Sequence, residues 1–304
     1  MRTSWRSSRR PRVSVGMPVY NGERYLAEAV DSLLAQTYED FELIICDNAS
    51  TDRTGEIARS YAARDTRVRY ARNEKNLGAG GNFRRGFALA SGEYFRWAAS
   101  DDVCAPQSLA RCVEVLDQEP AAVLAYPNTR FIDEHGRVTG ECYDDRLHLQ
   151  ASRASERFRQ VLERLGLCNA VYGLMRADVL KHTGLFGDFL AADIVFLAEL
   201  SLYGTFWEVP GALFFRRLHP GGTGGMDRLQ FRAYWHPDGR RRFDLREWRH
   251  LVELARAVVR APLNAAEKLR AARFLALRAI WNRDKLAREL FMGMRELTTG
   301  KLLC

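Results

Sequence analysis

Residues 41–52 read FELIICDNASTD, and this stretch decides the fold class. The run Leu43–Cys46 is continuously apolar, as is typical of strands in a parallel sheet that is covered on both faces. Polar residues follow at once, beginning with Asp47 and Asn48. In parallel sheets, ligands bind outside the carboxyl ends of the strands. The stretch therefore predicts a buried strand that delivers polar side chains to a ligand-binding edge.

Strand and helix patterns alternate on both sides of this stretch as far as residue 130. Apolar runs predict strands at 13–17, 41–46, 68–70, 94–98 and 122–126, and beyond residue 130 further strands at 169–176, 206–209 and 212–215. Amphipathic patterns predict helices at 23–35, 53–63, 83–89 and 106–116. Such alternation implies a mostly parallel sheet with helices on both faces. We therefore expect an α/β fold with a Rossmann-like nucleotide-binding half.

Length and composition narrow the class of protein. The 304 residues suffice for one large domain or two modest ones, and 47% hydrophobic with 28% charged residues is typical of a globular chain. No window of about 18 residues is apolar and uncharged, so no membrane span is expected. The six cysteines show neither a C-x-x-C pair nor metal-finger spacing, which favours reduced thiols in a cytosolic protein.

The net charge of +8 is unevenly distributed along the chain. Residues 1–12 hold five Arg and no acid, and residues 226–304 hold 18 Lys and Arg against 9 Asp and Glu. The segment between them is therefore acidic. This asymmetry argues against a nucleic-acid platform over the whole chain, and no nucleic-acid partner is expected. It predicts a disordered basic lead-in over 1–12, an acidic functional body and a basic tail.

Polar clusters follow four of the predicted strands. They lie at 18–22, 47–52, 72–78 and 100–102. Each cluster alone is compatible with a turn, because Asn, Asp, Ser and Gly are the usual turn residues. All four are expected at one edge of one sheet, however, and turn chemistry does not explain that coincidence. We therefore expect a binding site there.

Two adjacent acids, Asp101 and Asp102, close the run YFRWAASDD at residues 94–102. Two like charges a few ångström apart repel unless a cation or hydrogen bonds separate them. A hard divalent cation with oxygen ligands resolves this conflict and also bridges substrate phosphates. The alternative is a solvated turn before a helix that begins at Pro106.

With these motifs placed, the chain resembles the family 2 glycosyltransferases, which have a GT-A fold. The resemblance covers roughly residues 12–220. The matching motifs, in the family's order, are P-x-Y-N (Pro18, Tyr20, Asn21), D-N-x-S-x-D (Asp47, Asn48, Ser50, Asp52), R-N-x-x-N-x-G (Arg72, Asn73, Asn76, Gly78), S-G-E-Y before a strand, Asp101-Asp102, an Asp at the head of an apolar helix (Asp193) and R-x-H (Arg217, His219). The combination is specific, although no single motif is.

The resemblance implies transfer of a sugar from a nucleoside diphosphate to an acceptor hydroxyl, with inversion at the anomeric carbon. It implies that Asp47 hydrogen-bonds the base, most often uracil or thymine, and that Asp101 contacts the ribose. Asp102 and His219 would hold Mg²⁺ or Mn²⁺ on the diphosphate. The remaining residues implied to bind the nucleotide sugar are Pro18, Tyr20, Asn21, Asn48, Ser50, Arg72, Asn76, Gly78 and Arg217.

By the same resemblance Asp193 is the general base, since a single displacement needs one carboxylate to take the acceptor proton. Family members usually carry a second acid directly before this position, where this chain has Ala192. A helix N-cap is the alternative for Asp193. A surface position, or a histidine satisfied by neighbouring groups, is the alternative for His219.

The resemblance also divides the chain into a GT-A domain over 13–225, with a nucleotide-sugar half at 13–130 and an acceptor half at 131–225. A basic helical extension over 226–304 follows. Basic amphipathic helices with aromatics lie on anionic membranes or pack on protein. The extension is therefore compatible with peripheral contact at the inner face of the plasma membrane, with packing on the domain, or with a homodimer. The implied acceptor is a glycan or a lipid-linked molecule of bacterial polysaccharide, glycolipid or cell-envelope synthesis.

Two other functions compete with this one. A nucleotidylyltransferase would carry a Gly-rich loop with Arg or Lys after the first strand, and residues 18–22 do not match that pattern. A catalytically inactive scaffold that binds through its basic tail is disfavoured by the intact acids at 47, 101, 102 and 193.

Overall fold

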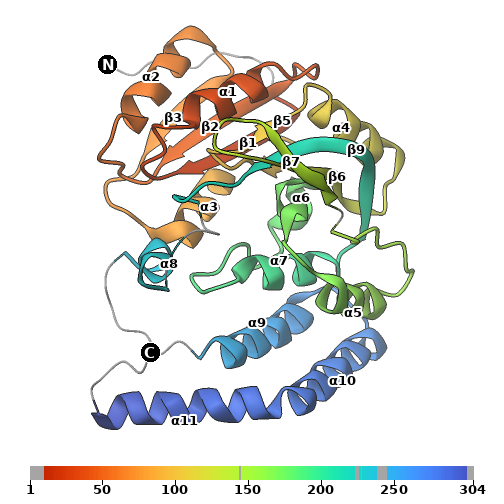
Figure 1. The fold of residues 1–304 in the computed structure, drawn as a ribbon. Coiled ribbons are helices and arrows are strands. Elements are labelled where there is room, and N and C mark those ends of the chain that lie inside the picture. The colour runs from red at the N-terminus through yellow and green to blue at the C-terminus, as the bar shows by residue number, and fades with distance from the viewer. Residues whose placement is uncertain (1–9, 144, 223–225, 227, 238–244, 300–304) are drawn as a thin grey trace.

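The computed structural model describes residues 10–299 apart from 144, 223–225, 227 and 238–244, and Figure 1 shows its fold. The strands are β1 Val13–Val19, β2 Phe41–Asp47, β3 Val68–Arg72, β4 Tyr94–Trp97, β5 Val103–Cys104, β6 Ala122–Ile132, β7 Val138–Tyr143, β8 Leu174–Arg176 and β9 Thr205–Arg217. The helices are α1 Leu26–Leu34, α2 Thr54–Arg64, α3 Gly78–Ala88, α4 Ser108–Gln118, α5 Ala154–Arg164, the 3-10 helix η1 Asn169–Tyr172, α6 Ala177–Leu180, α7 Ala192–Leu200, α8 Arg228–Trp235, α9 Arg246–Arg260, α10 Ala265–Trp281 and α11 Arg283–Thr299.

The strands of the described residues form one sheet in the order β3-β2-β1-β4-β8-β6-β9-β5, and β7 pairs with β6. β1 is parallel to β2 and β4, and β2 is parallel to β3. β8 runs antiparallel between β4 and β6, whereas β9 is parallel to β6. The predicted α/β class with a mostly parallel sheet is confirmed. The antiparallel β5, β7 and β8 belong to its second half.

Helices cover both faces of the sheet, and each face has its own hydrophobic core. α1, α2 and α4 bury their apolar side chains against one face. α3, α5, α6 and α7 cover the opposite face in a larger core (Figure 1). This arrangement follows from the sequence, because a strand such as β2, buried along its whole length, needs apolar cover on both sides.

The larger core is organised around Trp97 at the end of β4. The indole ring is fully buried and packs edge-on against Phe95, Phe186 and Phe196 at centroid distances of 4.8, 4.9 and 5.3 Å. Its Nε1 donates to the Phe83 carbonyl at 3.0 Å, so the one polar atom of the ring is also satisfied. This cluster ties β4, which precedes the two acids, to α3 and α7.

Three predicted elements differ from the structure in their details. The strand expected at 169–176 is the 3-10 helix η1 followed by the short β8, because Cys168 has a left-handed backbone (φ 59°) that ends any extended run. The two strands expected at 206–209 and 212–215 are one strand, β9, bent at Gly211 (φ 102°). The first helix begins at Leu26 and not at Glu23.

The C-terminal helices pack on the rest of the protein. α9 contributes Leu254 and Val258 to the larger core, and α10 contributes Ala271 and Leu275. The predicted packing of residues 226–304 on the domain is thus seen for the described part of this segment. No helix among the described residues is long and apolar enough to span a membrane. Residues 1–9 of the predicted disordered lead-in lie outside the described residues. The division of the GT-A domain into two halves at residue 130 stays a prediction.

The Trp97 cluster generates a stability prediction. Trp97→Ala should lower the free energy of unfolding by about 3–5 kcal/mol, because it removes the largest fully buried side chain and leaves a cavity. Trp281→Ala, at an exposed tryptophan of α10, should change it by less than about 0.5 kcal/mol. Urea unfolding followed by circular dichroism measures both. Equal losses in the two variants would contradict this account of the core.

Candidate active site

The carboxyl ends of β1, β2, β3 and β4 lie at one edge of the sheet, because these strands are parallel neighbours. Pro18 lies within β1, and the exposed Tyr20 follows that strand. Asp47 ends β2, in register with Val19 of β1 and Arg72 of β3. The sheet therefore brings together the predicted motifs at the ends of its first three strands.

Asp47 is fully buried and held by three donors. Its Oδ1 accepts the Ser50 backbone N–H at 2.8 Å, and its Oδ2 accepts the Tyr70 hydroxyl at 2.7 Å and Arg72 Nη1 at 2.6 Å. Burial alone would raise the pKa of Asp47, but these hydrogen bonds outweigh it and lower the pKa below its usual range. The carboxylate stays ionised. Its three donors fill three of about four acceptor positions.

The turn after β1 is locked onto the turn after β2. Asn21 has a left-handed backbone (φ 50°), which asparagine adopts at lower cost than most residues. Its N–H donates to Ser50 Oγ at 2.9 Å, and its Oδ1 accepts the Thr51 N–H at 2.8 Å. The next N–H, of Gly22, donates to Thr54 Oγ1 at 2.8 Å. The predicted Asn21 and Ser50 therefore position the two turns relative to each other.

A chain of amide side chains joins the ends of β2 and β3 to α3. Asn48 Nδ2 donates to Asn76 Oδ1 at 2.8 Å, and Asn48 Oδ1 accepts Asn73 Nδ2 at 3.0 Å. Asn73 Nδ2 also donates to Asn82 Oδ1 at 2.9 Å, and Asn82 Nδ2 donates to a β2 carbonyl at 2.8 Å. Three of the four, Asn48, Asn73 and Asn82, are buried. A satisfied network of this kind rigidifies the edge.

Gly78 begins α3 in a backbone conformation that favours glycine (φ 75°). A Cβ at this position would lie 2.4 Å from the carbonyl oxygen of Trp235 at the end of α8. The backbone N–H of Gly78 donates to Asn76 Oδ1 at 2.9 Å. The predicted glycine is thus required by close packing, and it lets α8 approach the binding edge.

The acid pair lies beyond the end of β4, opposite the end of β9. Asp102 is buried, and its Oδ1 accepts the backbone N–H of Arg217 at 2.8 Å. Burial, and next the negative charge of Asp101, raise the pKa of Asp102 well above its usual range. The Arg217 N–H and the charges of Arg216 and Arg217 act in the opposite sense. A buried carboxylate thus lies next to a partly exposed one.

The Arg217 guanidinium clamps the loop that carries the acids. Nε donates to the Asp101 carbonyl at 2.9 Å and Nη1 to the Asp133 carbonyl at 3.1 Å. Nη2 lies 2.6 Å from Glu28 Oε2, and the group stacks over the Tyr25 ring at 4.6 Å. Arg217 therefore connects α1 and the turn after β6 to the acid pair.

His219 contacts the same pair of acids. Its Nε2 is 3.0 Å from Asp101 Oδ2, and its ring packs edge-on against Tyr25 at 4.7 Å. The imidazole is mostly buried, so it is not a surface residue, and its bond to Asp101 is compatible with the alternative of a satisfied histidine. Its contact is with Asp101, beside the predicted metal ligand Asp102.

Asp193 occupies the first turn of α7. The N-cap is Ala191, which has a left-handed backbone (φ 56°), so Asp193 is not the N-cap residue. Its Oδ1 accepts the N–H of Ile194 at 3.0 Å, and the side chain remains partly exposed. Its negative charge is among the causes that raise the pKa of Cys168, after burial. Asp193 therefore faces the segment that leads into η1.

Asp101 and Asp193 act on the same tyrosine. Burial raises the pKa of Tyr234 most, and the negative charges of Asp101 and Asp193 raise it further. Burial and then the charge of Asp102 raise the pKa of Tyr172 at the end of η1. Asp193 therefore lies in the same part of the structure as the acid pair, although 90 residues stand between Asp102 and Asp193 in the sequence.

Several residues at this site were not among those predicted. They are Tyr25, Glu28, Tyr70, Asn82 and Tyr234. Asn82 carries a signal in the sequence, since an asparagine inside the Gly-rich stretch 78–86 disfavours a helix unless its side chain is bonded. The others carry none, because their roles depend on packing between elements distant in sequence.

The residues at the acid pair fit a divalent cation. Asp102 is a buried carboxylate whose pKa is raised by burial and a like charge, and a cation there would restore its ionised form. Within the described ranges no group of three or more His, Cys, Asp and Glu is arranged to hold a metal by itself. Mg²⁺ characteristically uses one or two carboxylates together with substrate phosphates and water, which matches this arrangement.

Comparison with known proteins identifies the family. The model of glycosyl transferase family 2 matches residues 14–184. The chain therefore belongs to glycosyltransferase family 2, and the identification made from its motifs is confirmed. The putative glycosyltransferase EpsE of Bacillus subtilis is 36% identical over 127 residues, which is 41% of this chain and 46% of EpsE. The matches to the first curated relatives span only 21% to 46% of those proteins' own length.

Solved structures confirm the predicted GT-A fold. The S. aureus TarS fragment 1–349 in complex with UDP-GlcNAc superposes with a TM-score of 0.63 at 19% identity, covering 87% of this chain and 71% of that one. The mannosyltransferase PcManGT of Pyrobaculum calidifontis, in complex with GDP-Man and Mn²⁺, gives a TM-score of 0.51 at 16% identity, covering 95% and 87%. At these identities the likeness shows the fold alone.

The Arg217 clamp generates a prediction. Arg217→Met should lower the free energy of unfolding by about 2–3 kcal/mol, because two buried carbonyls lose a charged donor. Arg216→Met, at the neighbouring arginine that donates to Leu167 and Asn169, should cost only about 1 kcal/mol. Guanidinium unfolding of both variants measures the difference. A larger loss in Arg216→Met would show that the clamp is misassigned.

Proposed function

We propose that this protein transfers a sugar from a nucleoside-diphosphate donor, with UDP or dTDP favoured, to an acceptor hydroxyl with inversion. The observation that carries the proposal is the acid pair beyond the end of β4, with Asp102 buried and Asp101 partly exposed, on the same sheet edge as Asp47. An ionised Asp47 suits hydrogen bonding to a base N–H. The metal-dependent part of the proposal rests on Asp102, a buried carboxylate directly beside Asp101 that accepts the Arg217 N–H at 2.8 Å.

The reaction is a single displacement at the anomeric carbon. The acceptor oxygen forms the new bond to the anomeric carbon. The bond between the anomeric carbon and the β-phosphate oxygen breaks, and its electron pair leaves with the nucleoside diphosphate. Asp193 takes the acceptor proton. We assign Asp101 to the ribose, oriented by His219 at 3.0 Å and by the Arg217 contact to its carbonyl. A divalent cation at Asp102 would stabilise the charge that develops on the leaving diphosphate.

Further support comes from the arrangement of the predicted contacts. Asn48, Asn76 and Gly78 form the amide-lined start of α3, near Asp47, where a nucleoside would lie. The acceptor side begins at Asp193 and η1, in the second half of the chain. We propose a glycan or lipid-linked acceptor in bacterial polysaccharide, glycolipid or cell-envelope synthesis. A homodimer stays a prediction.

Donor binding can be tested by thermal shift with UDP, dTDP, GDP, CDP and ADP, each with and without Mn²⁺. A nucleotide at about 100 times its dissociation constant should add about 2.7 kcal/mol to stability. We expect a shift for a pyrimidine nucleotide that requires Mn²⁺ in the wild type. Asp102→Asn should lose most of this shift, and the small shift that remains should be the same with and without Mn²⁺. Glu114→Gln, the same charge change on the exposed face of α4, should behave as wild type. No shift with any nucleotide would favour the scaffold function.

The role of Asp193 can be tested with the donor found in this way. Asp193→Asn should bind that donor as wild type does but form product about 10²–10⁴ times more slowly, because the acceptor proton has no base. Asp178→Asn is the matched control, since Asp178 also lies in the first turn of a helix, α6, and is exposed. Nucleoside diphosphate release and product formation are measured. Normal product formation by Asp193→Asn would remove this residue from the mechanism.

A further inference from the structure

Helix α10 presents an apolar face to solvent. Leu269, Ile280 and Trp281 are 72%, 55% and 67% exposed, and Leu277 is also exposed. Residues 8, 11 and 12 positions apart lie within about a third of a turn of each other on an α-helix. These four side chains therefore form one stripe, which we call the outer face of α10. Single exposed apolar residues are normal on a protein, but several large ones on one side of a helix mark an interaction surface.

The opposite side of α10 is firmly attached, so the exposure of the outer face does not reflect a loosely placed helix. Ala271 and Leu275 are buried in the larger core. Glu267 Oε2 accepts the backbone N–H of Ser155, in the first turn of α5, at 2.8 Å. Arg278 Nη1 donates to the Leu162 carbonyl of α5 at 3.3 Å. The orientation of the outer face is thus fixed by the protein.

Cations lie among the apolar residues of the outer face and just beyond its end. Arg270 and Arg273 lie within the same arc of the helix and are exposed, and the Arg283 side chain is 73% exposed just beyond Trp281. Two acids accompany them: Glu267 is paired with Arg270, and Asp284 lies 3.8 Å from Arg283. The segment 226–304 as a whole has 18 Lys and Arg against 9 Asp and Glu. The outer face therefore combines apolar side chains with net positive charge.

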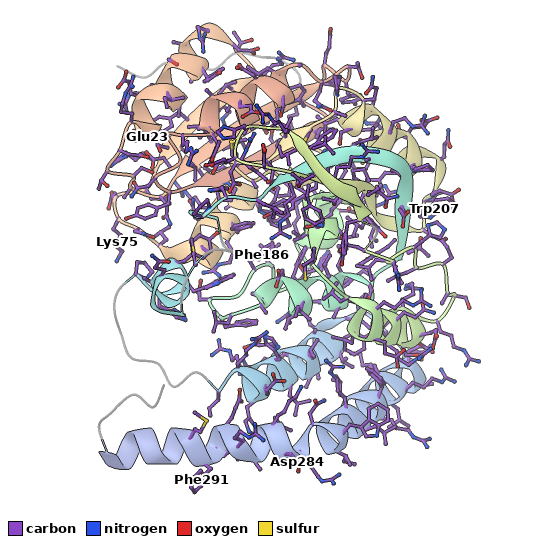
Figure 2. All side chains as sticks on the ribbon, in the orientation of Figure 1. Glu23, Lys75, Phe186, Trp207, Asp284 and Phe291 are labelled. Atoms are coloured by element: carbon purple, nitrogen blue, oxygen red, sulfur yellow. The ribbon has the colours of Figure 1, made fainter. Side chains whose placement is uncertain are left out.

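Apolar residues of the neighbouring helices extend this surface. Val259, at the end of α9, is 73% exposed, and Lys268 of α10 donates to its carbonyl at 2.7 Å. Phe291 of α11 is 58% exposed and points away from the body of the protein in Figure 2. Exposed apolar residues therefore occur on both helices next to α10 as well as on α10 itself.

We propose that the outer face of α10 binds the surface of an anionic lipid bilayer. Leu269, Leu277 and Ile280 would enter the acyl boundary, and Trp281 would lie at headgroup level, where its amphipathic ring is favoured. Arg270, Arg273 and Arg283 would contact lipid phosphates. Charge complementarity favours this occupant over a second copy of the chain, because two faces that both carry net positive charge repel each other whereas an anionic bilayer attracts them. The surface lies outside the candidate active site, so the proposal does not depend on the transfer reaction.

The full chain is tested by co-sedimentation with vesicles of phosphatidylcholine alone or mixed with phosphatidylglycerol. We expect binding to the mixed vesicles that weakens as salt is raised, and little binding to the neutral ones. Ile280→Ser combined with Trp281→Ser should reduce the partition coefficient by about tenfold or more. Val138→Ser, at an exposed apolar residue of β7, is the matched control and should leave it unchanged. Asp284→Asn should strengthen binding, because it removes an acid from this side.

Circular dichroism confirms that each variant is folded before its binding is interpreted. The proposal is overturned if wild type does not bind the anionic vesicles, or if the double Ser variant binds as well as Val138→Ser does. It is also overturned if sedimentation velocity shows an oligomer that the double Ser variant disrupts while vesicle binding stays absent. In that case the outer face of α10 is an interface between two copies.

Discussion

The candidate site depends on one constraint, which is that two adjacent carboxylates must be held at a buried strand end. Arg217 meets this constraint through both its backbone and its side chain. Its backbone N–H binds Asp102, while its guanidinium binds the Asp101 carbonyl and reaches Glu28 on α1. These contacts depend on β9, which pairs with β6 along most of its length and with β5 at Phe214 and Phe215. The acid pair is thus placed by the last strand of the sheet as much as by the strand it follows.

The electrostatic state of the edge gives a physical reason for a cation in the proposed mechanism. A nucleoside diphosphate brings negative charge to a region that already contains Asp47, Asp101 and Asp102. Arg72 is engaged by Asp47 and Arg217 by Glu28, so their charges are largely compensated within the protein. An added divalent cation can balance the acids and the incoming phosphates together.

The first half of the fold was predictable because its signals are local. The apolar run of β2 and the polar residues after it identify both a parallel strand and its functional end, and the same holds for β1 and β4. The second half was less predictable, since β8 is only three residues long and begins after the left-handed Cys168 and η1. Contacts such as Asn82 with the amide network or Tyr25 with His219 arise from packing, which no local pattern encodes.

The larger core has a consequence for how the protein unfolds locally. It includes Trp97 behind the acid pair, Trp235 next to Gly78, and Leu254 and Leu275 of the C-terminal helices. The nucleotide edge and the basic helices therefore belong to one cooperative unit rather than to a domain with a detachable appendage. In native-state hydrogen exchange, the amides of α9 and α10 would then open together with those of α3 and α7. A deletion at residue 225 would expose the core that supports the acids.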